Sequence, residues 1–457
     1  MPAGTGSKTL RISSVGLRGV VGGGLTAAHV IDFASAFGTL IEPGRPLCLG
    51  RDPRASGVMM REGVIAALMA CGHEVIDLGI ASSPIIQHTI RRMGAAGGIS
   101  ITASHNTAEW NALKFFGGRG SYLSTAESNE LLDIYHLRKF DYHDWTAVGH
   151  LREHAGAVDE YLEELARVFE FDLLRQFRVV VDCCNGTSAP ILRRLNERYG
   201  FQFILINGRM EGVHFAHDPV ISAETIDLQL APLMLPLKAD IGFQFDVDSD
   251  RVGIATETGR PVSEEMILPL IADWLLPRGS GDRVITNLSS TRLIEDVAAR
   301  HNGRVVRVPV GRQAAIDALS NYRKEQIAVA GEGTGAVMMP QFEFVYDGIA
   351  SMFAILSLLR ERGRRLSEIL DSYPKYIMRK GEAALTSTGI PDLMAALQAQ
   401  FSDGRIDMTD GLRVDWVDRW FHVRVSQTEP IVRIICEQKD TDPSSLYEEL
   451  LETVRRQ

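Results

Sequence analysis

Short apolar runs of strand character recur along the chain and alternate with segments whose apolar residues repeat at helical spacing. The helical pattern is clearest at residues 61–69 and 291–300. Strands that alternate with helices indicate βαβ units and largely parallel or mixed sheets, so the expected fold class is α/β. The predicted strands cover residues 46–50, 73–78, 97–101, 178–182, 201–206, 240–245, 283–287, 304–308 and 326–330.

The order of these runs predicts three consecutive α/β domains and a different C-terminal domain. A chain of 457 residues is too long for a single hydrophobic core. Changes in local composition predict the domains 1–153, 154–256, 257–373 and 374–457. The last domain combines strands at 421–425 and 431–436 with a closing amphipathic helix, which is typical of an α+β fold.

Composition and charge exclude several classes of function. The formal net charge of -10 argues against nucleic-acid binding, which needs a broad basic face. The five cysteines, at positions 48, 71, 183, 184 and 436, lack the spacing of metal ligands, so we expect reduced core residues. No run of 18 apolar residues and no apolar leader segment occurs, which predicts a cytoplasmic protein with no membrane partner.

The first candidate site is the turn Thr-Ala-Ser-His-Asn at residues 102–106, directly after the apolar run 97–101. Open α/β sheets bind ligands at the carboxyl ends of their strands, and this turn occupies such a position. The Ser104 hydroxyl becomes a useful nucleophile only beside a base, a metal or a positive field, which His105 and Lys114 could supply. The alternative is a turn whose side chains only satisfy backbone groups.

The second candidate is an acidic loop after the run 240–245. Asp246, Asp248 and Asp250 occupy alternate positions, and on an extended segment they would face one way and crowd their charges. Such crowding calls for a hard cation, Mg²⁺ or Ca²⁺. A Ca²⁺ helix-loop-helix site is rejected because Arg251 stands at its glycine position and both flanks have strand character. A solvated acidic turn is the other alternative.

Two further loops carry groups that suit a sugar and a phosphate. Glu332 and Thr334 lie between glycines at 331–335 and could bind vicinal hydroxyls, although a flexible turn between strands is the alternative. Arg424, Ser426 and Thr428 combine a guanidinium with two hydroxyls, a suitable cradle for a dianionic phosphate, although a simple strand-exit turn stays open.

A glycine-flanked arginine near the start of the chain completes the set. Arg18 lies between Leu17 and Gly19, two residues after Gly16, so the backbone there can come close to a phosphoryl group. With the four loops, this arginine predicts a site for phosphorylated small molecules.

These motifs, in this order, resemble the α-D-phosphohexomutase superfamily, whose members include phosphoglucosamine mutase, phosphomannomutase and phosphoglucomutase. The resemblance covers nearly the whole chain. It implies three similar α/β domains with mixed sheets and a C-terminal α+β domain, arranged around one central cleft. It also implies catalytic roles for Ser104, His105, Lys114 and Arg18, one Mg²⁺ held by Ser104, Asp246, Asp248 and Asp250, and substrate binding by Arg251, Glu332, Thr334, Arg424, Ser426 and Thr428.

The chain also departs from the family pattern. Thr107, Ala112 and Val425 replace residues that are usual in the family, and Ala336 stands where the sugar loop commonly has histidine. Because no histidine base is possible at that position, Lys114 or His105 becomes the candidate for proton transfer. The Gly-Glu-Gly-Thr-Gly form of the sugar loop most resembles a phosphoglucosamine-mutase-like branch.

The resemblance implies a phosphohexomutase reaction. Phosphorylated Ser104 would give its phosphoryl group to a hexose monophosphate, and the resulting bisphosphate would turn end for end and return the other phosphate. A sugar bisphosphate would serve as activator, and Lys114 would move the hydroxyl proton if its environment lowers its pKa. Glucosamine, mannose and glucose phosphates, and the oligomeric state, stay open at this point.

Two rival functions come from other classes of protein. Asp246 and Asp248 faintly resemble the nucleophile strand of a haloacid-dehalogenase-type phosphatase, in which Asp246 rather than Ser104 would carry the phosphate. A non-catalytic sugar-phosphate sensor is the second rival, and it would bind hexose phosphates without interconverting them.

Overall fold

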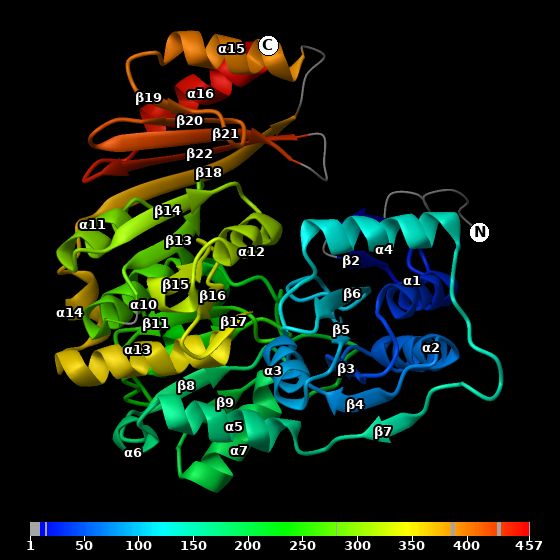
Figure 1. Ribbon diagram of the computed structural model, residues 1–457. Coiled ribbons are helices and arrows are strands. Elements are labelled where there is room, and N and C mark those ends of the chain that lie inside the picture. The colour runs from blue at the N-terminus through cyan, green and yellow to red at the C-terminus, as the bar shows by residue number, and fades with distance from the viewer. Residues whose placement is uncertain (1–9, 14–15, 280, 385–388, 427–430, 457) are drawn as a thin grey trace, which may run out of the picture.

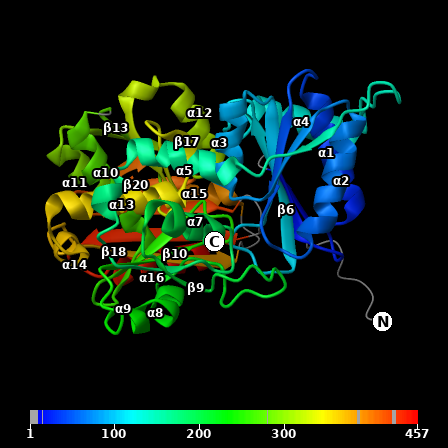
Figure 2. The same cartoon turned by 90° about the horizontal axis from the view of Figure 1, so that it is seen from below.

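The computed structural model describes residues 10–13, 16–279, 281–384, 389–426 and 431–456. The first domain forms one side of the molecule, the second and third lie together on the other side, and the C-terminal domain packs on the third (Figure 1). The view from below shows the same separation of the first domain from the rest (Figure 2).

The first domain contains a seven-stranded mixed sheet in the order β1-β2-β6-β5-β3-β4-β7. Its strands are β1 (Leu10–Ser13), β2 (Gly16–Val20), β3 (Leu47–Arg51), β4 (Val75–Ile80), β5 (Gly97–Ile101), β6 (Trp110–Gly117) and β7 (Leu151–Glu153). Its helices are α1 (Ala27–Leu40), α2 (Gly57–Ala70), α3 (Ser83–Met93) and α4 (Thr125–Leu137). Helix α3 has local start and stop signals, because the Ser82 side chain caps its first turn and Gly94 ends it in the left-handed conformation.

The second domain contains a five-stranded sheet in the order β12-β11-β10-β8-β9. Its strands are β8 (Val179–Asp182), β9 (Ile204–Ile206), β10 (Ile241–Phe245), β11 (Val252–Thr256) and β12 (Pro261–Val262). Its helices are α5 (Ala157–Val168), α6 (Phe171–Leu174), α7 (Ser188–Tyr199), α8 (Ala223–Gln229) and α9 (Ala231–Met234).

The third domain contains a five-stranded sheet in the order β14-β13-β15-β16-β17. Its strands are β13 (Arg283–Asn287), β14 (Arg304–Val308), β15 (Ile327–Gly331), β16 (Val337–Met339) and β17 (Glu343–Tyr346). Its helices are η1 (Glu264–Met266), α10 (Ile267–Leu275), η2 (Leu276–Arg278), α11 (Leu293–Arg300), α12 (Arg312–Ser320), η3 (Lys324–Gln326), α13 (Gly348–Arg362) and α14 (Leu366–Leu370).

The C-terminal domain is built on an antiparallel sheet in the order β18-β22-β21-β20-β19. Its strands are β18 (Tyr376–Ala384), β19 (Arg405–Asp407), β20 (Leu412–Asp415), β21 (Arg419–Val425) and β22 (Ile431–Lys439), and its helices are α15 (Ile390–Gln400) and α16 (Ser444–Arg456). The helices cover the outer face of the sheet, and β18 lies beside the third domain (Figure 1). This is the expected α+β domain.

One four-strand unit occurs in each α/β domain. The units are β4-β3-β5-β6, β9-β8-β10-β11 and β14-β13-β15-β16, in which the first two pairings are parallel and the last is antiparallel. In every unit a loop joins the third strand to the antiparallel fourth. Those three loops contain Ser104, the aspartates of 246–250 and Glu332. The polar loops of the sequence therefore hold one equivalent position in three related sheets.

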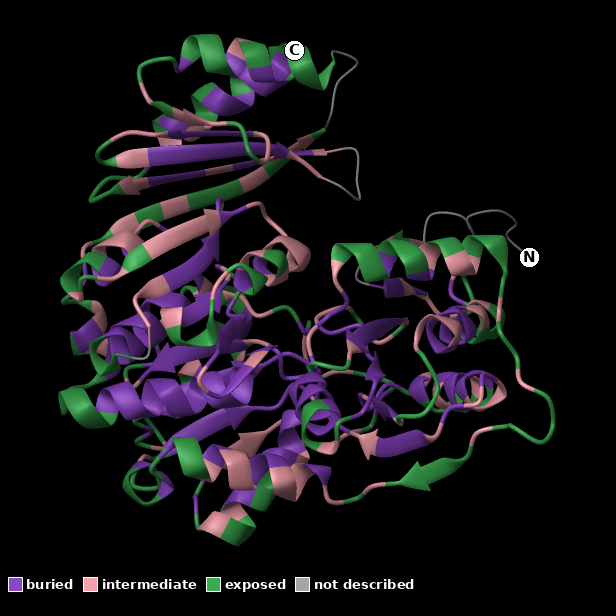
Figure 3. Cartoon of the chain, viewed as in Figure 1, coloured by how far each residue is buried: buried purple, intermediate pink, exposed green. Residues whose placement is uncertain are grey.

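The three α/β domains share one continuous apolar core. It extends from α3 of the first domain through α5 of the second to α13 of the third. Helix α13 is buried along most of its length (Figure 3), as expected for a helix that is apolar on all sides. The C-terminal domain has a core cluster of its own, and all five cysteines are buried and free, as predicted.

Each predicted strand has an observed counterpart whose limits differ by at most three residues, but strands such as β6 and β11 were not predicted. Strand β9 begins at Ile204, because Phe201 and Phe203 pack their rings against Phe353 before the ladder starts. The second sheet also continues past residue 256, because a turn at Gly259 returns the chain as β12, which pairs with β11. The predicted boundary at 256 is thus too early for this sheet. None of the helices in the described ranges combines the length and apolarity that a membrane span needs.

Candidate active site

The serine turn after β5 and the acidic loop after β10 meet across the boundary between the first two domains. The Ser104 hydroxyl donates a hydrogen bond of 2.5 Å to Oδ2 of Asp246. Ser104 is only 5% exposed and has a φ of 50°, in the left-handed region that non-glycine residues seldom adopt. A backbone outlier that aims a buried hydroxyl at a carboxylate suggests a functional position.

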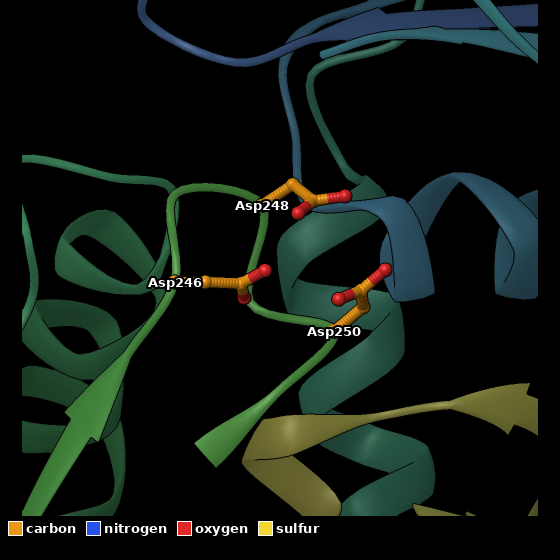
Figure 4. A group of neighbouring side chains, drawn as sticks. All are labelled: Asp246, Asp248 and Asp250. Atoms are coloured by element: carbon orange, nitrogen blue, oxygen red, sulfur yellow. The ribbon is translucent and has the colours of Figure 1, made fainter. Parts of the chain in front are cut away.

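The acidic loop is a tight turn and not an extended segment. Ser249 adopts a φ of 60° and turns the chain between β10 and β11. The turn still directs the three carboxylates toward one another (Figure 4). One ligand oxygen from each of Asp246, Asp248 and Asp250 lies within 4.8 Å of the other two, and all three residues are buried.

The donor set of this turn fits one hard divalent cation. Oδ1 of Asp248 and Oδ1 of Asp250 are buried and have no hydrogen-bond partner among the residues that the structure describes. Unsatisfied buried carboxylate oxygens are costly in a folded protein. Oxygen ligands of this kind are those that Mg²⁺ prefers.

Cationic side chains surround the same turn. Lys114 Nζ donates to Asp248 at 2.5 Å and to Asp250 at 3.0 Å, and Arg312 of the third domain donates to Asp250 at 2.9 Å. Burial would raise the pKa of Asp250, but Lys114, Arg312 and Arg251 hold it well below its usual value. The Asp246 pKa is raised by burial and by the other two aspartates.

Lys114 does not have the lowered pKa that a role as proton acceptor requires. Burial acts to lower the pKa of its ammonium, but the carboxylates of Asp248 and Asp250 outweigh burial and raise it. The ammonium group therefore stays charged in this arrangement. In this arrangement Lys114 is an electrostatic partner of the acidic loop, and its role in proton transfer stays a prediction.

His105 is neutral in this site. Burial, Arg251 and Arg18 lower the pKa of its imidazole to about 3. Arg251 Nη1 lies 3.0 Å from Nδ1 of His105. Because an arginine can only donate, Nδ1 is the accepting nitrogen and Nε2 carries the proton. His105 can therefore donate a hydrogen bond without carrying charge.

A cavity of about 220 Å³ opens beside Ser104 where the three α/β domains meet. Arg18 lines it and donates to Oδ1 of Asn106 at 2.9 Å. Residues from all three domains contribute to the lining, including Arg18, Ser104, His105, Lys114, Arg251 and Arg312. The structure thus brings together every predicted residue of the catalytic and metal groups.

The sugar loop between β15 and β16 is tied to the acidic loop. The Val252 amide, next to the acidic turn, donates to the Gly335 carbonyl at 3.2 Å. Glu332 accepts a hydrogen bond of 3.0 Å from the Tyr346 hydroxyl, whereas Thr334 is exposed. Gly333 is tightly enclosed, because a Cβ there would lie 2.2 Å from the Glu265 carboxylate.

The loop of the C-terminal domain that is predicted to bind phosphate stands apart from this cavity. Arg424 Nε lies 3.2 Å from Oδ2 of Asp410, and the Ser426 amide donates to the Ile431 carbonyl at 2.9 Å. Within the described chain, neither Arg424 nor Ser426 is among the residues that line the cavity. Thr428 lies outside the described residues.

Comparison with known proteins agrees with this geometry. Sequence models of phosphoglucomutase/phosphomannomutase match the chain as alpha/beta/alpha domain I over residues 12–141, domain II over 159–259 and domain III over 263–376. The chain belongs to the α-D-phosphohexomutase superfamily. It is therefore a phosphohexomutase, an enzyme that moves a phosphoryl group within a hexose phosphate.

Similar phosphohexomutases match nearly the whole chain. A probable phosphoglucosamine mutase of Pyrococcus abyssi is 32% identical, over 92% of each chain. A phosphoglucomutase/phosphomannomutase of Thermococcus kodakarensis is 30% identical, over 95% of this chain and 96% of the relative. A crystal structure of a phosphoglucomutase/phosphomannomutase family protein from Burkholderia thailandensis has a TM-score of 0.82 at 24% identity, over 98% of this chain and 97% of the other.

Family membership decides between the rival functions drawn from the sequence. The three matched domains belong to a phosphohexomutase and not to a haloacid-dehalogenase-type phosphatase. Asp246 also accepts a hydrogen bond from Ser104 and faces two other aspartates, as expected for a metal ligand. The phosphatase and the non-catalytic sensor are therefore set aside.

Three residues that shape the site of this phosphohexomutase were not predicted from its sequence. Arg312 reaches Asp250 from the third domain, the Ser83 hydroxyl donates to Asp248 at 2.5 Å from the start of α3, and Arg54 holds the serine turn. Arg54 follows the predicted strand 46–50, so its position at a strand's carboxyl end was an available signal. The contacts of Arg312 and Ser83 cross domain boundaries, which local patterns do not reveal.

Proposed function

We propose that this phosphohexomutase is a phosphoglucosamine mutase, which interconverts the 6- and 1-phosphates of glucosamine. Relatives with that name, including the Pyrococcus abyssi protein, support the proposal, as does the Gly-Glu-Gly-Thr-Gly sugar loop. The observation that carries the catalytic part is the 2.5 Å hydrogen bond between Ser104 and Asp246. It puts a reactive hydroxyl at a site suited to a divalent cation.

Ser104 is the residue that carries the phosphoryl group in this proposal. Asp246, Asp248 and Asp250 would hold one Mg²⁺ together with the phosphorylated Ser104. When bound, the ion neutralises charge on the phosphoryl oxygens, which is the largest part of catalysis in phosphoryl transfer. Lys114 adds positive charge from the side of Asp248 and Asp250.

The remaining loops bind the sugar phosphate and allow it to turn. Glu332 and Thr334 bind ring hydroxyls, while Arg424, Ser426 and Thr428 hold the phosphate that does not react. Arg18 and Arg251 line the cavity beside Ser104 and face the reacting phosphoryl group. A sugar bisphosphate is both the intermediate and the activator that phosphorylates Ser104. The C-terminal domain must then move to close over the sugar.

His105 takes the role of a neutral hydrogen-bond donor in this proposal. Its Nδ1 accepts from Arg251, so its Nε2–H is available to a phosphoryl or hydroxyl oxygen. Ala336 stands where the family commonly has histidine, so in this proposal the hydroxyl proton passes to a phosphoryl oxygen, to water or to Lys114.

A second substrate class has a specific observation in its favour. The Thermococcus kodakarensis relative named phosphoglucomutase/phosphomannomutase covers the chain as fully as the phosphoglucosamine mutases do. Glucose and mannose phosphates differ from glucosamine phosphate at one ring position, which only the pocket can discriminate.

A coupled assay with glucosamine 6-phosphate, mannose 6-phosphate and glucose 6-phosphate tests the proposal, with Mg²⁺ and the matching bisphosphate present. We expect kcat/KM to be at least about 10-fold higher for glucosamine 6-phosphate, the discrimination that one well-placed polar contact supplies. A preference for mannose or glucose phosphate would assign the chain to the second class.

Ser104→Ala tests the chemistry independently of the substrate. We expect turnover to fall below detection with all three sugars, because the phosphoryl carrier is lost, and acid-stable phosphate to disappear from the protein. Mutase turnover that persists in Ser104→Ala would refute the phosphoserine role even if the substrate preference were correct.

A further inference from the structure

A fully buried arginine lies directly beneath the serine turn. Arg54, between β3 and α2, is 0% exposed. Its Nη2 donates to the carbonyls of Ser104 at 2.9 Å and Asn106 at 2.6 Å, and its Nη1 donates to the carbonyl of Trp110 at 3.0 Å and to that of Thr107. One side chain thus binds three carbonyls of the segment between β5 and β6 and the carbonyl of the first residue of β6.

The hydrogen-bonding capacity of Arg54 is used up inside the protein. A guanidinium has five N–H donors in a fixed plane. Four of them bind the carbonyls, and Nε binds Oδ2 of Asp52 at 2.9 Å. No donor is left for a substrate, so Arg54 acts on the reaction through the backbone that it holds.

Asp52 holds the backbone amide of Ser104 indirectly, through the Thr102 hydroxyl. Its Oδ2 accepts a hydrogen bond of 2.6 Å from the Thr102 hydroxyl, and the Thr102 hydroxyl accepts one of 3.0 Å from the Ser104 amide. Asp52 is itself fully buried and paired with Arg54. Both the N–H and the C=O of Ser104 are therefore fixed by the Asp52–Arg54 pair.

A loop of the second domain closes over this pair. The Phe215 ring lies 4.9 Å from the Arg54 guanidinium, and the Ala55 amide donates to the Gly212 carbonyl at 3.0 Å. A cation stacked on an aromatic ring gains favourable electrostatic energy. The support of Ser104 is thus anchored in the same domain that supplies the three aspartates.

We infer that Arg54 is a positioning residue for phosphoryl transfer, which holds Ser104 in its left-handed turn with the hydroxyl aimed at the acidic loop. The inference rests on the proposed phosphoserine role of Ser104. A misplacement of the reacting group by about 1 Å can reduce the rate about 100-fold. Loss of the Arg54 fork therefore lowers kcat and the transfer of phosphate to Ser104, while the sugar-binding loops and KM stay unchanged.

Arg54→Lys is the main test, because it keeps the buried charge and loses the planar fork. We expect kcat to fall about 100-fold and KM to change less than about threefold. Incubation with glucose 1,6-bisphosphate, followed by intact-mass measurement, should show phosphate reaching Ser104 about 100-fold more slowly than in the native protein. The double variant Asp52→Asn with Arg54→Met removes both charges and should behave in the same way if Arg54→Lys does not fold.

Arg194→Lys is the matched control. Arg194 also forms a two-bond fork to a carboxylate, that of Asp159, but at the surface and remote from Ser104. We expect its kcat and phosphorylation rate to equal those of the native protein.

The inference would be overturned if Arg54→Lys had the native kcat, or if it had a raised KM with an unchanged kcat. It would also be overturned if Arg194→Lys lost as much kcat as Arg54→Lys. A loss of stability without slower phosphorylation, measured well below the melting temperature, would assign Arg54 a structural role alone and so also overturn it. Ser104→Ala is run in parallel. If Ser104→Ala stays active, the proposed function fails, and if only Arg54→Lys behaves as the native protein, this inference fails by itself.

Discussion

Ser104 combines two features that are costly for a single residue. Its left-handed backbone costs on the order of 1–3 kcal/mol, and its hydroxyl is buried beside three carboxylates. Contacts from Asp246 and from the carbonyl-binding guanidinium of Arg54 offset that cost. Backbone strain of this kind is found at functional sites, where one side chain must be held in one position.

The pKa of His105 leads to a prediction on pH. Since burial and two arginines lower it to about 3, the folded protein keeps the imidazole neutral while the unfolded chain protonates it below about 6.5. The contribution of His105 to stability is therefore present above pH 6.5 and is lost as the pH falls toward 3. Urea unfolding of the native protein and of His105→Gln at several pH values measures this.

We expect the stability difference between the native protein and His105→Gln to shrink as the pH falls from 7 to 4, with Mg²⁺ held constant. A matched series on His136→Gln, an exposed histidine at the end of α4, should show no such trend. A difference that grows on acidification would mean that His105 is charged in the folded protein.

The residues of the site motifs could be predicted from the sequence. The charge states of their side chains could not. The positions of Ser104 and the three aspartates follow from strand ends, which local patterns reveal. The raised pKa of Lys114 depends on carboxylates that lie 134 and 136 residues away in the chain. Electrostatics of this kind come from domain packing, which the sequence pattern does not contain.

At the scale of elements, the loop between β15 and β16 is shaped by its glycines. Gly335 has a φ of 79°, and a Cβ there would lie 2.5 Å from the Val252 carbonyl oxygen. The same glycine accepts the hydrogen bond from the Val252 amide. The sugar loop and the start of β11 therefore approach as closely as a residue without a side chain allows.

Gly335→Ala should lower the free energy of unfolding by more than about 2 kcal/mol, because left-handed strain and a backbone collision add. Gly363→Ala is the control, since Gly363 has a φ of 58° with open space around it, and should cost only about 1 kcal/mol. Denaturant unfolding compares the two. Equal losses would show that the contact between the loops is unimportant.

Element boundaries were the least predictable part of the fold. The alternation of apolar runs located β5, β13 and β14 at their observed limits. It missed several strands, including β6 and β11, and also β12, a strand of two residues whose pairing depends on the turn at Gly259. Short edge strands have too few side chains to leave a pattern.

At the scale of the whole molecule, three domains contribute to the surroundings of one acidic turn. The second domain supplies the aspartates, the first supplies Ser83 and Lys114, and the third supplies Arg312. The C-terminal domain has a separate core and reaches the third domain through contacts such as Lys380 with Glu265 at 2.8 Å. Removal of a cation from the turn should therefore affect all three α/β domains.

Mg²⁺ should raise the melting temperature, because a ligand that binds the folded state stabilises it by about 2.7 kcal/mol at 100 times its Kd. Chelation should reverse the effect and abolish mutase activity. Asp248→Asn should lose the response to Mg²⁺, whereas Asp172→Asn, at an exposed carboxylate of α6, should keep it. Thermal melting with chelator and with added Mg²⁺ tests this, and a native response in Asp248→Asn would contradict the site.

The repeated strand order has a consequence for how such an enzyme changes. In the proposed function, one connection that occurs three times carries three separate tasks: phosphoryl transfer, neutralisation of charge and selection of the sugar. Because these tasks belong to different copies of the connection, substitutions in residues 332–336 could change which hexose is bound. Ser104 and the neighbouring aspartates would stay unchanged. A new substrate preference can then evolve without any change in the residues that transfer the phosphoryl group.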